Sequence, residues 1–144
     1  MFAGTPTVSG YIFVANDDSI PKGESPKISS IVIERGKGEV ETLMLPYRAI
    51  ANIPILQENS VTSGFFNTVP DDDGIIRSVP LMMKYENALF PALSLEMIRF
   101  GEDENKIYIN YNGNDGVSSI ELGKHNIPTD RFGRMIVNFY GGAH

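Results

Sequence analysis

The chain has 144 residues and a net charge of -6, from 12 Lys+Arg and 18 Asp+Glu, and 42% of its residues are hydrophobic. This length and composition predict one globular domain with a core of its own and exclude a disordered segment. The acidic balance excludes a dense basic surface for nucleic acid or an anionic membrane, and the lack of cysteine excludes disulfides, a thiolate nucleophile and Cys-ligated zinc.

No apolar run in the sequence approaches the roughly 20 residues that a membrane-spanning helix needs. The first ten residues, MFAGTPTVSG, also lack the basic and apolar regions of a signal peptide. We therefore expect any membrane anchor or targeting segment to lie outside residues 1–144.

The first half of the chain begins with a clear strand pattern. The alternation in Val8–Val14 places Tyr11 and Phe13 on one face of a strand, and both faces are apolar enough to be buried. The composition of the following segments predicts a solvated loop at residues 16–27, weaker strands at 30–34 and 40–45, and short helical turns at 46–58.

The middle of the chain contains a strong turn sequence, Asp71-Asp72-Asp73-Gly74. It is flanked by two segments typical of strands, residues 61–67 and 77–85. This arrangement predicts an antiparallel hairpin. Because Pro80 cannot donate a backbone hydrogen bond, its strand is expected at a sheet edge or at a bulge.

The clearest helix pattern covers residues 89–100. Asn87 is a suitable N-cap, Pro91 fits the first turn, and Gly101 predicts a left-handed stop at the C-terminus. Helical spacing predicts a buried apolar face made of Leu89, Leu93, Met97 and Phe100. It predicts a solvent-facing side that carries Ser94, Glu96 and Arg99.

Three further strands are predicted in the last third of the chain, at Lys106–Tyr111, Val117–Leu122 and residues 135–140. Turn sequences rich in Asn, Asp and Gly separate them. Taken together, the predicted elements give an α+β fold, with a mostly antiparallel sheet packed with one or two helices.

The acidic turn is the most conspicuous polar cluster in the sequence. Asp71 and Asp73 could supply oxygen ligands to a hard cation, but a calcium loop of the EF-hand type counted from Asp71 needs Glu at its twelfth position, which is Met82. A turn in which the aspartates cap backbone amides is the simpler interpretation. Arg77 can pair with either aspartate or point at an anionic ligand, and Asn67 can anchor loop backbone. We single out Asn67, Asp71, Asp73 and Arg77 as ligand-binding or loop-shaping residues.

No other pattern specifies a reaction. Of the two histidines, His125 lies in a strand-to-loop segment and His144 is terminal, so a transition-metal site is not expected. The sequence also lacks the G-x-S-x-G motif of serine hydrolases and the glycine spacing of a phosphate-binding loop. It therefore predicts no catalytic residue, no metal and no cofactor.

Between residues 64 and 142, several short motifs follow one another in a specific order. They are G-F-F-N, D-D-D-G, R-x-x-P-L, F-P-A-L-S-L-E, I-P-T-D and G-R-M-I-V-N-F-Y-G. This order resembles the C-terminal half of the type-two CHASE domain, the cyclase/histidine-kinase-associated sensory extracellular domain, and Val8–Val14 resembles the N-terminal strand of that family. Two departures are small: Ala92 stands where the family often has serine, and Phe139 moves the tyrosine one place later.

The resemblance implies an extracytoplasmic (periplasmic or extracellular) sensor domain of a membrane-anchored receptor, with a histidine kinase, nucleotide cyclase or Ser/Thr kinase as output outside this chain. Because the family's domain begins with a further α/β portion, the resemblance implies that residues 1–144 are a single partial domain. The family's domain is not known for catalysis, so the resemblance implies no enzyme. It implies an unknown small molecule or a periplasmic protein as partner, and no nucleic acid.

Two rival functions remain open at this point. The chain could be a structural or dimerisation domain without a ligand, and a sheet edge left uncovered would then favour a homodimer. The aspartates could alternatively belong to a metal-dependent hydrolase.

Overall fold

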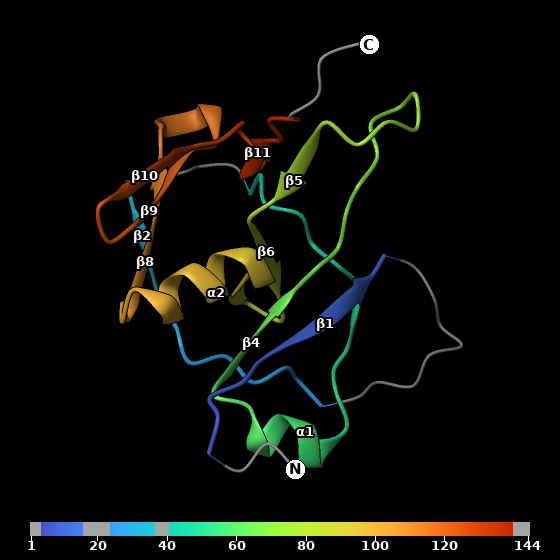
Figure 1. Cartoon of the computed structure of the whole chain (residues 1–144). Coiled ribbons are helices and arrows are strands. Elements are labelled where there is room, and N and C mark those ends of the chain that lie inside the picture. Colours follow the sequence, from blue (N-terminus) through green and yellow to red (C-terminus); the bar gives the residue numbers. More distant parts are fainter. Residues whose placement is uncertain (1–3, 16–23, 37–40, 140–144) are drawn as a thin grey trace, which may run out of the picture.

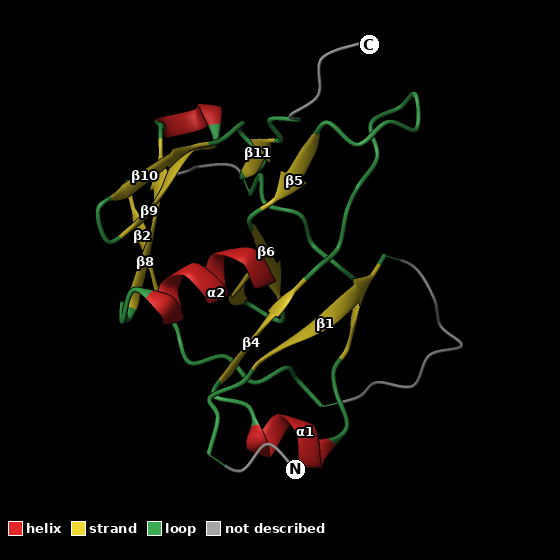
Figure 2. Cartoon of the chain, in the orientation of Figure 1, coloured by secondary structure: helices red, strands yellow, loops and turns green. Residues whose placement is uncertain are grey.

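The computed structural model describes residues 4–15, 24–36 and 41–139. In chain order the elements are β1 (Val8–Val14), β2 (Ile31–Arg35), β3 (Arg48–Ile50), α1 (Pro54–Asn59), β4 (Thr62–Phe65), β5 (Ser78–Pro80), β6 (Met82–Tyr85), β7 (Ala88–Pro91), α2 (Leu93–Gly101), β8 (Lys106–Tyr111), the 3-10 turn η1 (Gly113–Asp115), β9 (Val117–Leu122), β10 (His125–Pro128) and β11 (Arg134–Ile136). Short strands dominate and helices are few (Figure 2), so the predicted α+β class is confirmed.

Helix α2 lies between two groups of strands (Figure 1). On one side is the sheet β10-β9-β8-β2, whose buried residues Ile107, Ile109 and Ile120 share a core with Leu95 of α2. On the other side, α2 contacts β4 and β1. The helix therefore joins two separate hydrophobic cores.

The second core is surrounded by a closed series of strands, which we call the strand ring. It runs through β3, β1 and β4, then β7 and β6, and returns along the segment that leads into β3. Single bridges complete it, one between Phe65 and Ala92 and one between Met44 and Met83. The core contains a cluster of aromatic side chains, which are Tyr11, Phe13, Phe65, Tyr85 and Phe90. Their centroids lie as close as 5.3 Å in edge-to-face contact, the geometry that aromatic pairs prefer.

Strands β1 and β4 run parallel and carry the same kind of triplet in register. Ser9-Gly10-Tyr11 lies opposite Ser63-Gly64-Phe65. A Cβ atom on Gly64 would lie 2.5 Å from Cα of Leu93, the first residue of α2. Glycine is therefore required where the helix begins on the sheet, while the aromatic residues of the triplets are buried in the strand ring.

The predicted hairpin of residues 61–67 and 77–85 is wrong. β4 pairs in parallel with β1, β5 pairs with β11, and β6 pairs with β7. The β6–β7 hairpin instead turns through Glu86 and Asn87, which both have positive φ angles of 48° and 64°. Two left-handed residues are what a type I′ hairpin turn requires.

The predicted start of the main helix is also wrong, as are three positions on its predicted faces; Ser94 is exposed as predicted. α2 begins at Leu93 because Ala88–Pro91 forms β7, so Asn87 is a turn residue and not a cap. Gly101 does not adopt a positive φ, whereas Asp103 does. Glu96 and Arg99, expected in solvent, are 0% and 3% exposed, while Met97 is 58% exposed.

The remaining boundaries agree to different degrees. β1, β8 and β9 have the predicted bounds, and β2 is shifted by one residue. Residues 46–58 contain β3 before the helix α1, and residues 40–45 contribute only the bridge at Met44, with Val40 outside the described residues. The last strand is Arg134–Ile136, with Tyr140 outside the described residues, and β10 was not predicted. Most of the predicted loop at 16–27 also lies outside the described residues.

Candidate functional site

A small pocket lies at the end of the strand ring where the parallel strands β1 and β4 finish, and we call it the end pocket. Its volume is about 200 Å³. The walls come from residues 13–15 at the end of β1, from residues 44–46, and from Asn67, Val69 and Met83. Phe13 and Met83 belong to the buried aromatic core, so its inner wall is fixed by core packing.

Asn67 closes one side of the end pocket and is held tightly. Its Oδ1 accepts a hydrogen bond of 2.7 Å from the backbone N–H of Phe13, and its Nδ2 donates one of 2.6 Å to the Phe13 carbonyl. The side-chain amide thus replaces the strand neighbour that β1 would otherwise need at this point. The sequence predicted that Asn67 anchors loop backbone; the backbone that it holds belongs to strand β1, and its part in ligand binding stays a prediction.

A larger and more open pocket continues from the end pocket. Its volume is about 470 Å³, and it shares Ala15, Leu45 and Pro46 with the end pocket. Its other walls include polar and charged side chains, namely Tyr47, Arg48 and Glu86. The two spaces together fall in the range of roughly 300–1,000 Å³ that small-molecule sites occupy.

The acidic turn sits at the tip of the connection between β4 and β5, residues 66–77, which projects from the body of the molecule (Figure 1). Gly74 has φ of 81°, and the backbone N–H of Gly74 donates to the Asp71 carbonyl at 2.8 Å. Arg77 donates through both terminal nitrogens to Asp73, at 2.9 and 2.7 Å, and through Nη1 to Asp71 at 3.2 Å. Three of the four predicted site residues, Asp71, Asp73 and Arg77, therefore come together.

The ion pairs of this turn change the acidities of its groups. The Arg77 guanidinium holds the pKa of the Asp73 carboxyl below its usual range, and the backbone N–H of Ile75 adds to the effect. The two aspartates in turn raise the pKa of Arg77. Both terminal nitrogens of Arg77 donate hydrogen bonds to carboxylates of the turn, so the guanidinium stabilises the turn itself. Its part in ligand binding stays a prediction.

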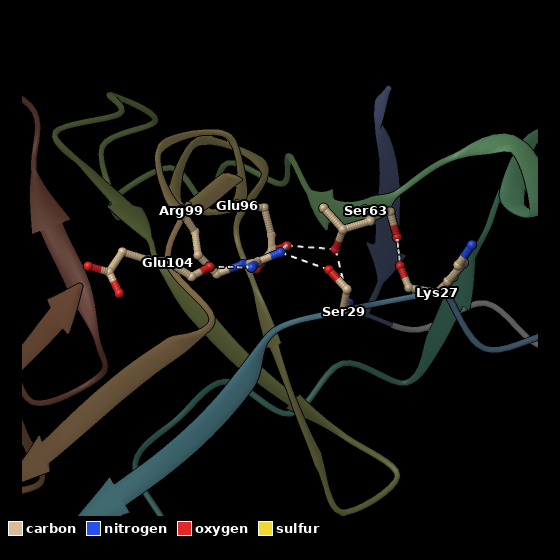
Figure 3. A network of polar contacts seen from close by, with 7 residues as sticks. Lys27, Ser29, Ser63, Glu96, Arg99 and Glu104 are labelled. Atoms are coloured by element: carbon tan, nitrogen blue, oxygen red, sulfur yellow. Dashed lines mark hydrogen bonds and ion pairs between the residues drawn. The ribbon is translucent and has the colours of Figure 1, made fainter. Parts of the chain in front are cut away.

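A buried polar network, which the sequence did not indicate, ties α2 to its surroundings (Figure 3). Arg99 forms two hydrogen bonds of 2.9 Å with the Glu96 carboxylate, from Nε and from Nη2. Thr62 of β4 donates to Glu96 at 2.6 Å, and Arg99 also donates to Ser29 at 2.8 Å and to the Glu104 carbonyl at 2.6 Å. Each charge is thus satisfied in several directions, which a buried ion pair needs.

The network lies beside the aromatic core of the strand ring. Burial raises the pKa of the Tyr11 hydroxyl, and the nearby Glu96 charge raises it further. Tyr11 therefore stays neutral at any physiological pH. Glu96 and Arg99 were missed as partners because their i,i+3 spacing is common on exposed helix faces, and burial of the pair depends on Thr62 and Ser29 from distant segments.

Groups that could support metal or acid–base chemistry are dispersed in the described part of the chain. There, no group of three or more His, Asp and Glu side chains is arranged to hold a metal ion. His125 contacts Glu102 at 2.8 Å on the surface, and this contact lowers the pKa of Glu102. Neither helix of the described residues has the length and apolarity that a membrane crossing requires.

Comparison with known protein families matches residues 7–144 to the CHASE2 domain. Searches of the curated proteins and of the solved structures gave no match. The match covers both hydrophobic cores, the end pocket and the acidic turn.

Proposed function

The chain belongs to the CHASE2 domain family, whose members are sensory extracellular domains of signalling receptors, and on this premise we propose that it binds a small-molecule signal in the end pocket. The receptor would be anchored in the membrane outside this chain, with the domain in the periplasm or outside the cell. A histidine kinase, nucleotide cyclase or Ser/Thr kinase would supply the output, and the domain itself would be no enzyme.

The observation that carries this proposal is the position of the end pocket. Ligands commonly bind at the mouths of closed strand arrangements, where core side chains form the floor and strand ends supply the walls. Here the floor is Phe13 and Met83, and Asn67 fixes one wall through two hydrogen bonds. Walls that need no ordering on binding reduce the free-energy cost of association.

The connection between β4 and β5 links this pocket with the acidic turn. Asn67 and Val69 line the pocket, and the same segment continues through Asp71 and Asp73 to Arg77. The Arg77 carbonyl then accepts a hydrogen bond of 2.9 Å from Val137, next to the strand pair β5–β11. We propose that Asn67, Asp71, Asp73 and Arg77 shape this segment so that occupancy of the pocket alters its position. A ligand shifts the equilibrium between two positions of this segment only by the difference between its affinities for them.

The methionines offer a direct test. Met44 and Met83 border the end pocket, Met82 and Met135 belong to the other core, and Met97 is on the surface of α2. In a small-molecule screen read by methyl NMR, we expect some compounds to shift the Met44 and Met83 signals together and to leave Met97 unchanged. The proposal fails if no compound moves these two methyls, or if every binder moves Met82, Met135 or Met97 instead.

A structural or dimerisation role is the second candidate, and one observation favours it. Within the described ranges, β2 pairs with β8 alone, and its first residue, Ile31, is 54% exposed. An edge of this kind is a template for pairing with a second copy. We would test it by sedimentation of the wild type and of Ile31→Lys across a range of concentrations. Association that the substitution abolishes, together with an empty screen, would favour the dimerisation role.

A metal-dependent hydrolase built on the aspartates has little support. Arg77 already pairs with Asp71 and Asp73, so a cation would have to displace a guanidinium that makes hydrogen bonds to both carboxylates.

A further inference from the structure

We infer that the end pocket takes a compact, uncharged molecule built on a single ring and carrying one hydroxyl or carbonyl group. The inference rests on the proposed function and specifies the ligand class for the same site.

The walls of the end pocket favour an uncharged ligand. Nine of the described residues line the end pocket; eight of these are apolar, and Asn67 is the polar one. Moving an ionised group from water into such surroundings is strongly unfavourable unless a partner charge is present. Among the residues that the structure describes, no charged side chain lines the end pocket, so we infer a neutral group for the part of the ligand that enters it.

The end pocket has room for one ring. The volume is about 200 Å³, and an apolar cavity of roughly 150 Å³ is large enough to bind benzene. One six-membered ring therefore fits with a short substituent, whereas a peptide or a fused ring system does not. A longer substituent would extend past Ala15 and Leu45 into the larger pocket.

The side chains that would contact the ring of the ligand favour an aromatic ring. Met44 in the wall and Met83 in the floor present thioethers to the pocket, and methionine sulfur makes favourable contacts with aromatic rings. Phe13 adds an aromatic neighbour at the floor. These residues favour an aromatic ring over an aliphatic chain.

Asn67 has hydrogen-bonding capacity left for a ligand. A side-chain amide has two N–H groups and an oxygen with two lone pairs. The bonds with Phe13 use one N–H and one lone pair. The other N–H can donate to a ligand hydroxyl or carbonyl oxygen, whereas the other lone pair can accept only from a hydroxyl. A single hydroxyl or carbonyl on the ligand therefore finds its partner in Asn67.

Three probes of nearly equal size separate the charge classes: benzyl alcohol, benzoate and benzylamine, the last two charged at pH 7. We expect benzyl alcohol, with a Kd on the order of 1 mM for so few atoms, to shift the Met44 and Met83 methyls and the Asn67 amide. Benzoate and benzylamine should bind at least tenfold more weakly. Equal or stronger binding of either ion at the same methyls would overturn the ligand class and leave the proposed pocket intact.

A pair of matched substitutions tests the site. Val69→Asp places a carboxylate in the pocket wall, and Val61→Asp makes the same change on the surface between α1 and β4. We expect Val69→Asp to weaken benzyl alcohol binding at least tenfold and Val61→Asp to leave it unchanged, with unshifted Met82 signals showing that both variants fold. If both variants bind equally well, or if benzyl alcohol moves neither methyl in the wild type, the inference is wrong. The library screen then decides the proposed function separately.

Discussion

Asn67 holds Phe13 by both of its backbone polar groups, with Oδ1 2.7 Å from the nitrogen and Nδ2 2.6 Å from the oxygen. Removing the side chain would leave a partly buried N–H and C=O at the end of β1 without these partners. We expect Asn67→Ala to lower the free energy of unfolding by about 1–3 kcal/mol. Urea denaturation measures it, and Asn114→Ala, on an exposed turn, should change stability by less than about 0.5 kcal/mol. Equal stability of the two variants would show that the Asn67 contacts do not hold the strand.

The contact between Gly64 and α2 predicts a steric effect. A Cβ at Gly64 would approach Leu93 Cα to 2.5 Å, whereas a Cβ at Gly101 meets nothing within 4 Å. We expect Gly64→Ala to reduce stability by about 1–3 kcal/mol through overpacking. Gly101→Ala, at the other end of the same helix, should be neutral or slightly stabilising. Thermal unfolding of both variants checks this, and an unchanged Gly64→Ala protein would contradict the observed helix placement.

The buried pair of Glu96 and Arg99 predicts strong coupling. Arg99→Met leaves the Glu96 carboxylate buried without its cation, and we expect a loss of about 3–5 kcal/mol. The double variant Glu96→Leu/Arg99→Met should lose less, because no charge remains buried. Arg35→Met, which removes an ion pair on the surface, should cost about 1 kcal/mol or less. Urea denaturation measures the single variants Glu96→Leu and Arg99→Met and the double variant. If the stability losses of the two single variants add up to that of the double variant, the two residues are not coupled and the network is contradicted.

The acidic turn predicts a pH dependence. The pKa of Asp73 is lowered in the folded chain, so its contribution to stability is complete above the unfolded pKa of about 3.9 and is lost as pH falls through the folded pKa. Arg77→Gln removes the main cause of the lowered Asp73 pKa, the hydrogen bonds from the guanidinium. We therefore expect the Asp73 carboxyl to titrate at a higher pH in this variant. NMR titration of the side chain measures it. Arg131→Gln, on another turn, should leave the Asp73 titration as in the wild type, and a shift of equal size there would show a general charge effect.

Sequence periodicity predicted those elements whose structure depends on their own residues. β1, β8 and β9 each contain alternate buried residues, such as Tyr11 and Phe13 in β1 and Ile107 and Ile109 in β8, and their bounds were correct. The acidic turn was also predictable, since Asp and Gly at these positions favour it wherever the flanking strands go.

The errors came from pairings between distant segments. β4 joins β1 across about fifty residues of chain, and no local pattern distinguishes this from a hairpin with the following strand. The three wrongly predicted positions on the faces of α2 have a similar origin. Glu96 and Arg99 are buried because Thr62, Ser29 and the Glu104 carbonyl meet them there, and Met97 is left outside. The end pocket was not predicted for the same reason, since its walls come from four separate segments.

The most direct test of the sensory function is the output of the intact receptor. The compound that moves the Met44 and Met83 methyls would be titrated against the wild-type receptor and against receptors carrying Val69→Asp or Val61→Asp. We expect the wild type and Val61→Asp to respond with the same midpoint, and Val69→Asp to need at least tenfold more compound or to stop responding. A Val69→Asp receptor that is present at normal levels and responds like the wild type would contradict ligand sensing at the end pocket.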